Sequence, residues 1–426
     1  MISRARCAGF ARLLRCLCGV PLLAVGLIVG TASAQKFSRA EASAFDLFKE
    51  AEDIILQKVY KTEPLPVFLN KALHGLAAQL GEPGKGHDPD LSSLPDADAW
   101  ATFQREILAL ANAPGQRLDV HSLVERALQI WCHQHDPYTR YTPAEDYLDA
   151  KRLSNGSDGG VGMALNERNG EFFCFPLPGS PAEASGVKAG DKLLSVDGRA
   201  AKDRPYLEYL AALIRGAAGT EVQLRVEHSF GRSQSIRIAR EKLGPSSVIP
   251  EKKITGLMLR VRRFTASTVA ETRSALASLG PADTLTLDLR GCEGGQLNVG
   301  VEFASLFMDT GEPIVTLRQR DKPDDIRGAT QPRTFKPAAL SILQDEGTAS
   351  AAEMVIAALV NSPRAAAVTQ GSKTFGKGAV QDVIELKGGG RLLLTTGELI
   401  SPQGFGWDGI GLLPSLENHG RIFPKD

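Results

Sequence analysis

The sequence has no excess of charge of either sign and few cysteines. Its 426 residues include 49 basic and 49 acidic side chains, so nothing in it favours binding to nucleic acid or to an anionic membrane. Three of the six cysteines lie within the first 18 residues. The others, Cys132, Cys174 and Cys292, are an odd and widely spaced set, which argues against both a disulfide framework and a zinc site.

Long apolar runs and histidines are scarce as well. After residue 34 no stretch approaches the roughly 18 apolar residues of a membrane-spanning helix, so we expect no membrane span in the mature chain. Of the seven histidines, His133 and His135 lie close together in HQHD, but no third ligand stands at a suitable spacing. We predict no metal site and no cofactor here, and a surface turn ending at Pro137.

The first 34 residues have the pattern of a secretory signal peptide. A start rich in arginine precedes a mostly apolar stretch at 21–30 and the cleavage site Ala32-Ser33-Ala34. We predict that the mature chain begins at Gln35 and is secreted to the periplasm. An uncleaved membrane anchor is the alternative, although the apolar core is short for a span.

The mature chain of 392 residues, which is 426 minus 34, is long enough for two to three domains. Its 43% hydrophobic and 23% charged residues are typical of a globular protein. Apolar residues recur at helical spacing from Ser38 to about Lys71 and from Trp100 to about His133, with a loop at Gly81 to Asp98 between them. Residues 35–154 are therefore predicted to form an N-terminal helical region.

Short strand patterns replace the helical ones after a glycine-rich break at Asn155 to Gly160. The patterns are VGMAL, EFFCFPL, DKLLSVDG, EVQLRVEHS and SIRIARE, and a short and a longer helical pattern lie between them. Residues 155–244 are predicted to form a small module rich in β-strands.

Residues 245–426 are predicted to form an α/β domain. The strand patterns GLMLRVRRF and TLTLDLRG are each followed by a helical one, at Ala266 to Leu279 and at Val299 to Met308. Asp321 to Pro337 is expected to be a loop close to the functional site, and Gly388 to Gly390 the turn of a hairpin. The fold class is therefore multidomain α/β (α+β).

A strand-to-helix turn in this last domain has the features of a nucleophile site. An apolar run ending at Leu343 predicts a buried strand and Met354 to Val360 a helix, so Ser350 lies between them. There its hydroxyl is exposed, and the N–H of Ala351, reinforced by the helix dipole, points at an anion formed beside it. Because Ser350-x-x-Glu353 is also a capping box, a plain N-cap is the alternative.

Lys377 is a candidate base for this serine. It lies between Gly376 and Gly378, before a strand pattern at Ala379 to Leu386, and a lysine needed only for solubility does not require glycines on both sides. Burial would disfavour its charged form and lower its pKa toward the working pH. No histidine occurs between His228 and His419, so a Ser–His pair is less direct. A surface lysine in a glycine turn is the alternative.

The two motifs GTASAAE and KTFGKGAVQ resemble those of the C-terminal processing peptidases, a family of PDZ-containing Ser–Lys proteases. The resemblance implies that Ser350 is the nucleophile, Lys377 the general base and Gln381 the side chain that orients the lysine. The serine and the lysine lie two residues further apart than is usual in the family, through extra residues in VTQGSK. Asn361 stands where some relatives carry an acidic residue.

The resemblance covers nearly the whole mature chain. DPYTRY at 136–141 matches a family motif that follows the N-terminal helices, and residues 155–244 resemble a PDZ domain. In a PDZ domain a glycine-rich loop binds a peptide's terminal carboxylate through backbone N–H groups, and the next strand edge pairs with the peptide. The residues in the place of this loop are Gly159, Gly160, Val161, Gly162 and Met163.

The turn after TLTLDLRG corresponds to the family motif DLRxNxGG, in which a glycine N–H completes the oxyanion hole. We choose Gly294 for this role. Cys292 and Glu293 stand where relatives often have Asn and Pro. A generic strand-to-helix glycine turn is the alternative.

The sequence therefore predicts a secreted serine endopeptidase acting on proteins or peptides with free C-termini. A non-catalytic peptide-binding or scaffold protein is the alternative; the two-residue insertion favours it weakly, and the intact Ser350, Lys377 and Gln381 oppose it. An esterase of small molecules is a third hypothesis, disfavoured because the PDZ-like module would have nothing to select. A homo-oligomer is compatible with the sequence.

Overall fold

The computed structural model describes residues 37–423 except for short gaps at 82–88, 114–117, 156, 169, 178, 205, 229–230, 243–246, 255 and 278–282. The predicted signal peptide lies outside the described residues. From Arg39 onward the chain forms one unit, described below as a helical region, a PDZ-like domain and an α/β core. Within the described ranges no helix has both the length and the apolar character needed to cross a membrane.

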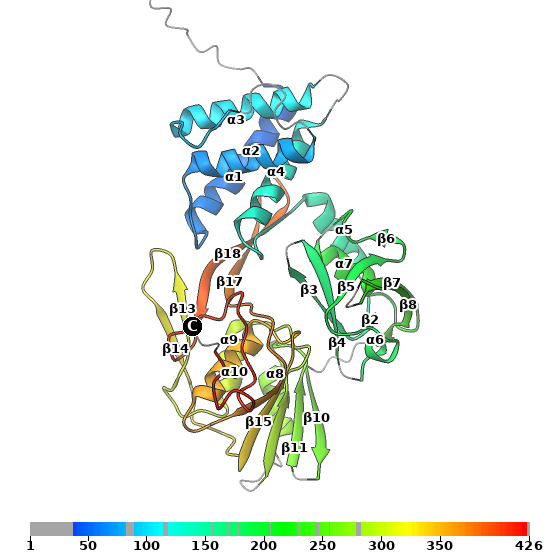
Figure 1. Ribbon diagram of the computed structural model, residues 1–426, viewed down its shortest axis with the longest axis vertical. Coiled ribbons are helices and arrows are strands. Elements are labelled where there is room, and N and C mark those ends of the chain that lie inside the picture. The colour runs from blue at the N-terminus through cyan, green and yellow to red at the C-terminus, as the bar shows by residue number, and fades with distance from the viewer. Residues whose placement is uncertain are drawn as a thin grey trace, which may run out of the picture. The chain divides into compact units, whose positions relative to one another are not determined.

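Four helices make up the N-terminal region (Figure 1): α1 (Arg39–Lys58), α2 (Leu65–Gln79), α3 (Asp96–Ala111) and α4 (Val120–His135). The predictions of one helical stretch over 38–71 and another over 100–133 are wrong, because each stretch is divided into two helices. Pro64 and Pro66 interrupt the first, since a proline lacks the N–H that an inner turn requires but is tolerated at a helix start. Pro114 and Gly115 stand in the sequence where the second is divided.

Aromatic side chains hold these helices together. Phe48, Phe68, Phe103 and Trp131 are fully buried, one from each helix, and the rings of Phe68 and Trp131 have centroids 4.5 Å apart. Asp119 caps α4 by accepting the N–H of Ser122.

The PDZ-like domain is built on a six-stranded antiparallel sheet in the order β3-β4-β5-β7-β8, with β6 on β5. The strands are β3 (Met163–Arg168), β4 (Glu171–Pro176), β5 (Asp191–Val196), β6 (Arg199–Ala200), β7 (Glu221–Glu227) and β8 (Ser233–Ala239). The short β2 (Gly159–Gly160) pairs with β9 (Glu241–Lys242). The helices are α6 (Pro181–Ala184), α7 (Leu207–Ile214) and α5 (Ala144–Ser154), which packs on α7. The five predicted strands and two predicted helices are all present.

The α/β core contains a five-stranded sheet, in the order β10-β11-β12-β15-β16. Its strands are β10 (Val248–Lys253), β11 (Gly256–Val261), β12 (Thr284–Asp288), β15 (Ala339–Gln344) and β16 (Val368–Gly371). All but the edge strand β10 run parallel. The helices α8 (Thr268–Ala275), α9 (Leu297–Ser305) and α10 (Ala351–Asn361) share one apolar core with this sheet.

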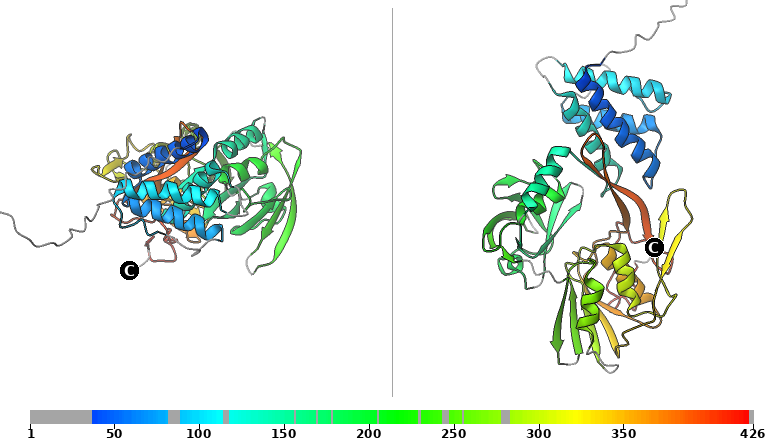
Figure 2. Two further views of the ribbon diagram at one scale, coloured as in Figure 1. Left: turned by 90° about the horizontal axis from the view of Figure 1, so that it is seen from above. Right: turned by 180° about the vertical axis from the view of Figure 1, so that it is seen from behind.

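A third sheet joins the core to the N-terminal helices. It contains β1 (Arg140–Thr142), β13 (Pro313–Gln319), β14 (Asp325–Gly328), β17 (Ala379–Glu385) and β18 (Arg391–Ile400). The predicted hairpin at Gly388 to Gly390 is the turn between β17 and β18, which runs from the core to the helical region in both Figures 1 and 2. The prediction of a loop over 321–337 near the site is wrong, because this segment contains β14 and none of it lines the cavity described below.

The strand order brings three turns together. Since β12, β15 and β16 are parallel neighbours, the turns that follow them meet at one edge of the sheet. These turns carry Gly294, Ser350 and Lys377, which lie far apart in the sequence.

Candidate active site

Ser350 lies at the N-terminus of α10, in the turn that follows β15, as predicted. Its φ of 57° is in the left-handed region, which a residue with a side chain adopts at a cost of about 1–3 kcal/mol and which is common at functional sites. The turn is tied to its neighbour by Asp345, whose carboxylate accepts the N–H groups of Gly347 and Gly291 at 3.0 and 2.9 Å.

The fully buried carboxylate of Glu353 holds this turn against the loop of Lys377. It accepts the N–H groups of Ser350 at 2.9 Å, Gly376 at 2.7 Å and Lys377 at 2.8 Å. It also accepts the hydroxyl of Thr374 at 2.5 Å. Burial raises the pKa of Glu353 to about 7, against the opposing effect of these hydrogen bonds. The acidic residue of the sequence's capping box thus connects two separate loops.

The lysine loop is fixed from two further sides. Asp408 accepts the N–H of Gly378 at 3.0 Å, and the hydroxyl of Tyr138 donates to the carbonyl of Gly376 at 2.9 Å. The Lys377 Nζ lies 5.6 Å from the centroid of the Tyr138 ring. Burial lowers the pKa of Lys377, and within the described part of the chain this lysine makes no ion pair. Its backbone is therefore rigidly held and its amine is shifted toward the neutral form.

Ser350, Lys377 and Gln381 line one cavity of about 580 Å³. The amide of Gln381 donates to the carbonyl of Tyr138 at 3.0 Å, so it reaches the lysine's surroundings through that residue. Apolar side chains that also line the cavity are Leu165, Leu207, Phe264, Phe375, Val383 and Leu393.

The glycine turn after β12 lies directly beside Ser350. A Cβ on Gly294 would stand 2.9 Å from the Ser350 Cβ and 2.8 Å from the nitrogen of Ala351, so these backbones are in contact. The carbonyl of Cys292 accepts the N–H of Ala349 at 2.9 Å. Burial raises the pKa of the Cys292 thiol to about 12.

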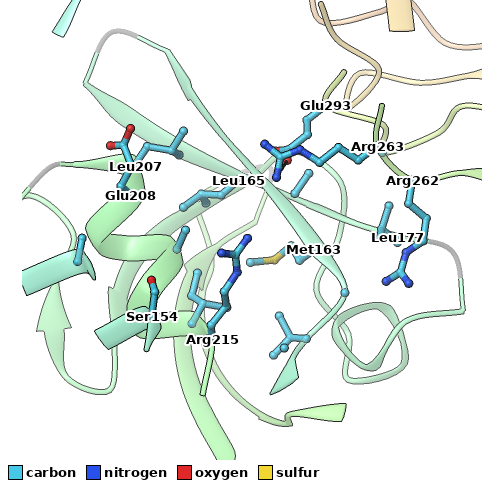
Figure 3. Close-up of a pocket in the computed structure, with 18 of the residues that line it drawn as sticks. Ser154, Met163, Leu165, Leu177, Leu207, Glu208, Arg215, Arg262, Arg263 and Glu293 are labelled. Atoms are coloured by element: carbon cyan, nitrogen blue, oxygen red, sulfur yellow. Dashed lines mark ion pairs between the residues drawn. The ribbon is translucent and has the colours of Figure 1, made fainter. Parts of the chain in front are cut away.

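A second cavity, of about 760 Å³, is lined by the PDZ-like domain together with residues of the α/β core, among them Arg262, Arg263 and Glu293 (Figure 3). Gly160, Val161, Gly162 and Met163 line it, whereas Gly159 does not and instead pairs with Gly216. The loop is anchored through carbonyl groups: those of Val161 and Gly162 accept N–H groups of Ala182 and Leu177. Figure 3 shows Met163 and Leu165 of β3 and Leu207 of α7 around this cavity.

The two cavities are neighbours, because they share part of their lining. The shared residues are Leu165, Leu207, Glu208, Arg263, Thr265 and Glu293. Arg263 and Glu293 form an ion pair at 3.4 Å and lie together in Figure 3. The cavity beside the PDZ-like loop therefore borders the cavity of Ser350.

The described residues contain no cluster suited to metal binding, and their cysteines are buried. His135 stacks on Trp131, with ring centroids 4.5 Å apart, and Asp136 accepts the N–H groups of Tyr138 and Thr139. In the part of the chain that the structure describes, no group of three or more His, Cys, Asp or Glu side chains is placed to hold a metal ion. Cys132, Cys174 and Cys292 are free and buried.

Several residues at the site escaped the sequence analysis. Tyr138 and Arg140 belong to DPYTRY, so the motif marked the segment but not its contact with the lysine. Glu353 was recognised only as a capping residue. Glu167 of β3 and Asp408 near the C-terminus carried no signal in the sequence.

Comparison with known proteins agrees with this arrangement. A family model described as Peptidase family S41 matches residues 256–417, and one described as PDZ domain matches residues 176–228. The chain is 33% identical over 289 residues to a carboxyl-terminal-processing protease of Picosynechococcus sp., an alignment that covers 66% of this chain and 69% of that protein. It is 31% identical over 286 residues to a probable CtpA-like serine protease of Staphylococcus haemolyticus, covering 66% of this chain and 57% of that protein.

A solved structure shares the fold. The photosystem II D1 C-terminal processing protease superposes with a TM-score of 0.64 at 21% identity, over 89% of this chain and 92% of that chain. The helical region, the PDZ domain and the α/β core thus occur together in another protein.

Proposed function

Because this chain belongs to the carboxyl-terminal-processing proteases, the serine proteases of peptidase family S41 with a PDZ domain, we propose that it is an endopeptidase with Ser350 as nucleophile and Lys377 as general base. One observation carries the assignment of these two residues. The single carboxylate of Glu353 holds the backbones of both, and both side chains line the same cavity.

In the proposed reaction the neutral amine of Lys377 accepts the proton of the Ser350 hydroxyl as its oxygen attacks the scissile carbonyl carbon. The lysine then gives this proton to the leaving amine, and an acyl-enzyme remains on Ser350. A water molecule, deprotonated by the same lysine, releases the new C-terminus. Gln381 stays our candidate for orienting the lysine, supported by its bond to Tyr138.

The oxyanion formed in this attack is assigned to the N–H groups of Ala351 and Gly294. Ala351 is the first residue of α10, where the helix dipole favours a negative charge. The backbone of Gly294 is in contact with that of Ala351, and its N–H is our candidate for the second donor. Positive φ angles at Gly294 and Gly295 are a backbone conformation that glycine adopts readily.

The PDZ domain is proposed to select substrates by their free C-termini. Backbone groups of Gly160 to Met163 would take the terminal carboxylate, and β3 would pair with the peptide as an added strand. The shared lining of the two cavities supports this role, since a chain bound along β3 would lie next to the cavity of Ser350. Apolar side chains around the catalytic cavity favour apolar substrate residues next to the cleaved bond.

We also propose that the protein acts outside the cytoplasm, in the periplasm, after removal of residues 1–34. The arginine-rich start and the Ala32-Ser33-Ala34 sequence support this. N-terminal sequencing of the chain recovered from the cell envelope should begin at Gln35. A start at Met1 in the mature protein would contradict it.

The test of the function is the variant Ser350→Ala in the chain from Gln35. The wild type should degrade a fluorescently labelled unfolded casein, and the variant should not. The variant should still fold, because losing a helix cap costs only about 0.5–2 kcal/mol. Ser372→Ala, which removes an exposed hydroxyl of the lysine loop, is the matched control and should keep activity.

Two outcomes would decide against the mechanism. Equal cleavage by a purified, folded Ser350→Ala variant would mean that another residue is the nucleophile. No cleavage by the wild type, together with binding of peptides, would favour the non-catalytic scaffold.

A further inference from the structure

An ion pair connects the PDZ domain to the surroundings of the catalytic lysine. Arg140 of β1 and Glu167 of β3 line the catalytic cavity together with Lys377. The Arg140 Nε donates to the Glu167 carboxylate at 2.6 Å, and a second guanidinium nitrogen contacts the same oxygen. Both side chains are only 10% exposed, so solvent screens this pair weakly.

The guanidinium of Arg140 is held by three hydrogen-bond acceptors. It donates to the backbone carbonyls of Thr139 and Pro137, each at 2.7 Å, in addition to Glu167. Because the two carbonyls belong to its own segment, Arg140 is held independently of β3, whereas Glu167 belongs to the PDZ domain. The cation is therefore fixed by its own segment, and its counterion is supplied by the PDZ domain.

The charges that face Lys377 come from three carboxylates besides Arg140. Glu293 lies in the glycine turn and is itself paired with Arg263, Asp408 lies near the C-terminus, and Glu167 lies on β3. The three carboxylates favour the charged form of the lysine, and Arg140 disfavours it. The ring of Tyr138 completes the surroundings, and His133 stands 3.9 Å from Glu167.

We propose that the Arg140–Glu167 pair is the contact through which the PDZ domain acts on the catalytic base. Arg140 repels a proton from Lys377, and Glu167 weakens this repulsion while β3 is docked. Loss of the Glu167 carboxylate alone would leave the cation and make the neutral lysine more abundant at a given pH. Arg140 and Glu167 are thus positioning residues of the proposed Ser–Lys site, on which this inference rests.

The charge effect has a signature that loss of packing lacks. Glu167→Gln removes a carboxylate near the lysine, so the pKa of Lys377 should fall. Arg140→Gln removes a cation and frees Glu167, so the pKa of Lys377 should rise. Each shift should be about one unit, as expected for the loss of one nearby charge. If the pair were only a structural contact, both Glu167→Gln and Arg140→Gln would lower stability, and the pKa of Lys377 would not shift in opposite directions.

The pKa of Lys377 can be measured without turnover. Competitive labelling of the folded chain with acetic anhydride across a pH series, followed by mass spectrometry of the Lys377 peptide, reports the fraction of neutral amine. The rise of kcat/KM with pH on labelled casein should move in the same two directions. Arg140→Lys keeps the cation and should restore a value near that of the wild type.

The control is Asp149→Asn. It breaks the ion pair between Asp149 of α5 and Arg204 in the PDZ domain, and neither residue lines the catalytic cavity. This variant can change the rate of casein cleavage, but the pKa of Lys377 should be the same as in the wild type. If Arg140→Gln does not fold, the fall in the pKa of Lys377 in Glu167→Gln still tests the inference.

If the two pKa shifts have the same direction, or are no larger than that of the Asp149→Asn control, the inference is overturned. Its failure is distinguishable from that of the proposed function. Cleavage of casein without opposed shifts refutes only the coupling. Opposed shifts in a chain that cleaves nothing support the charge coupling and refute the protease.

Discussion

At the scale of single residues, the proposed mechanism depends on the charge state of Lys377. A lysine can accept a proton only when it is neutral, and burial lowers the pKa of Lys377 from its ordinary range. The surroundings include the Tyr138 ring and charges of both signs, so neutralisation depends on a balance of nearby groups rather than on burial alone.

We predict that Lys377→Arg abolishes cleavage, because an arginine keeps its charge at every accessible pH and cannot act as the base. The wild-type rate should rise with pH through the lowered pKa of Lys377, since the neutral form is the active one. Initial rates on labelled casein between pH 5 and pH 10 would measure both effects.

Lys373→Arg is the control for this prediction, because Lys373 is exposed and lies in the same loop. It should leave the rate and its pH dependence unchanged. An active Lys377→Arg enzyme together with an inactive Lys373→Arg enzyme would assign the base to Lys373.

At the scale of elements, the site depends on close contact between two turns. The turn after β12 and the turn after β15 approach so closely that no side chain fits between them. Gly294 has a φ of +91°, and a Cβ there would stand 2.7 Å from the carbonyl oxygen of Ala349. The position requires glycine because its φ is positive and because the neighbouring backbone leaves no space for a Cβ.

Gly294→Ala should therefore reduce kcat by about a hundredfold, as a displacement of roughly 1 Å at an active site does. Gly311→Ala is the matched control. Gly311 has a similar φ of +85°, but nothing lies within 4 Å of its Cβ position. Both variants carry a backbone cost of about 1–2 kcal/mol, so only the contact at the site differs between them. Equal kcat values in the two would show that the oxyanion turn tolerates displacement.

The PDZ loop is a second element whose shape can be tested. A peptide with a free C-terminus and apolar last residues should bind the Ser350→Ala chain about ten- to a hundredfold more tightly than its amide, because a charge-assisted hydrogen bond contributes about 1.5–3 kcal/mol. Fluorescence anisotropy on the two forms would measure the ratio. Equal affinities would mean that this loop does not read C-termini.

Gly162→Val should remove this preference. The new Cβ would stand 2.6 Å from the Ser180 Cβ, so the loop must move. Gly186→Val, at a φ of +98° with nothing within 4 Å, is the control in the same domain and should keep the preference for the acid.

At the scale of the whole molecule, the buried Glu353 makes stability depend on pH. Its pKa in the folded protein is raised from 4.5 to about 7, so the folded state holds a proton that the unfolded chain has already released. The stabilisation from this proton is complete below pH 4.5 and is lost as the pH rises through about 7.

We predict that the unfolding free energy of the wild type falls relative to Glu353→Gln by up to about 3 kcal/mol between pH 4.5 and pH 8. Urea denaturation of both proteins at several pH values would measure this difference in unfolding free energy. Taking the difference cancels the contributions of all other titrating groups, because they are common to the two proteins. Glu302→Gln, on the exposed face of α9, should show a constant difference instead. A constant difference for Glu353→Gln would place its pKa near the ordinary value.

The N-terminal helices show where local patterns misled the sequence analysis. Apolar residues recur at helical spacing on both sides of the breaks after Lys58 and Ala111, because each of these helices buries one apolar face. Prolines in the sequence marked the breaks, and periodicity alone did not. In the PDZ domain, by contrast, glycines punctuate the strands, so five strands and two helices were recognised.

The sequence by itself determined the features that depend on neighbours along the chain. These include the strand-to-helix turn of Ser350, the glycines around Lys377, the glycine turn of Gly294 and the family to which the chain belongs. Each follows from turn chemistry and periodicity within a few residues, which the sequence displays directly.

Only the tertiary structure decided which distant groups surround the base. Glu353 binds the loop of Lys377, Tyr138 faces the amine, and Arg140 pairs with Glu167 because strand order and domain packing bring their segments together. A charge acts on a pKa through distance in space. Since that distance is set by packing across the fold, no local pattern in the sequence could have indicated it.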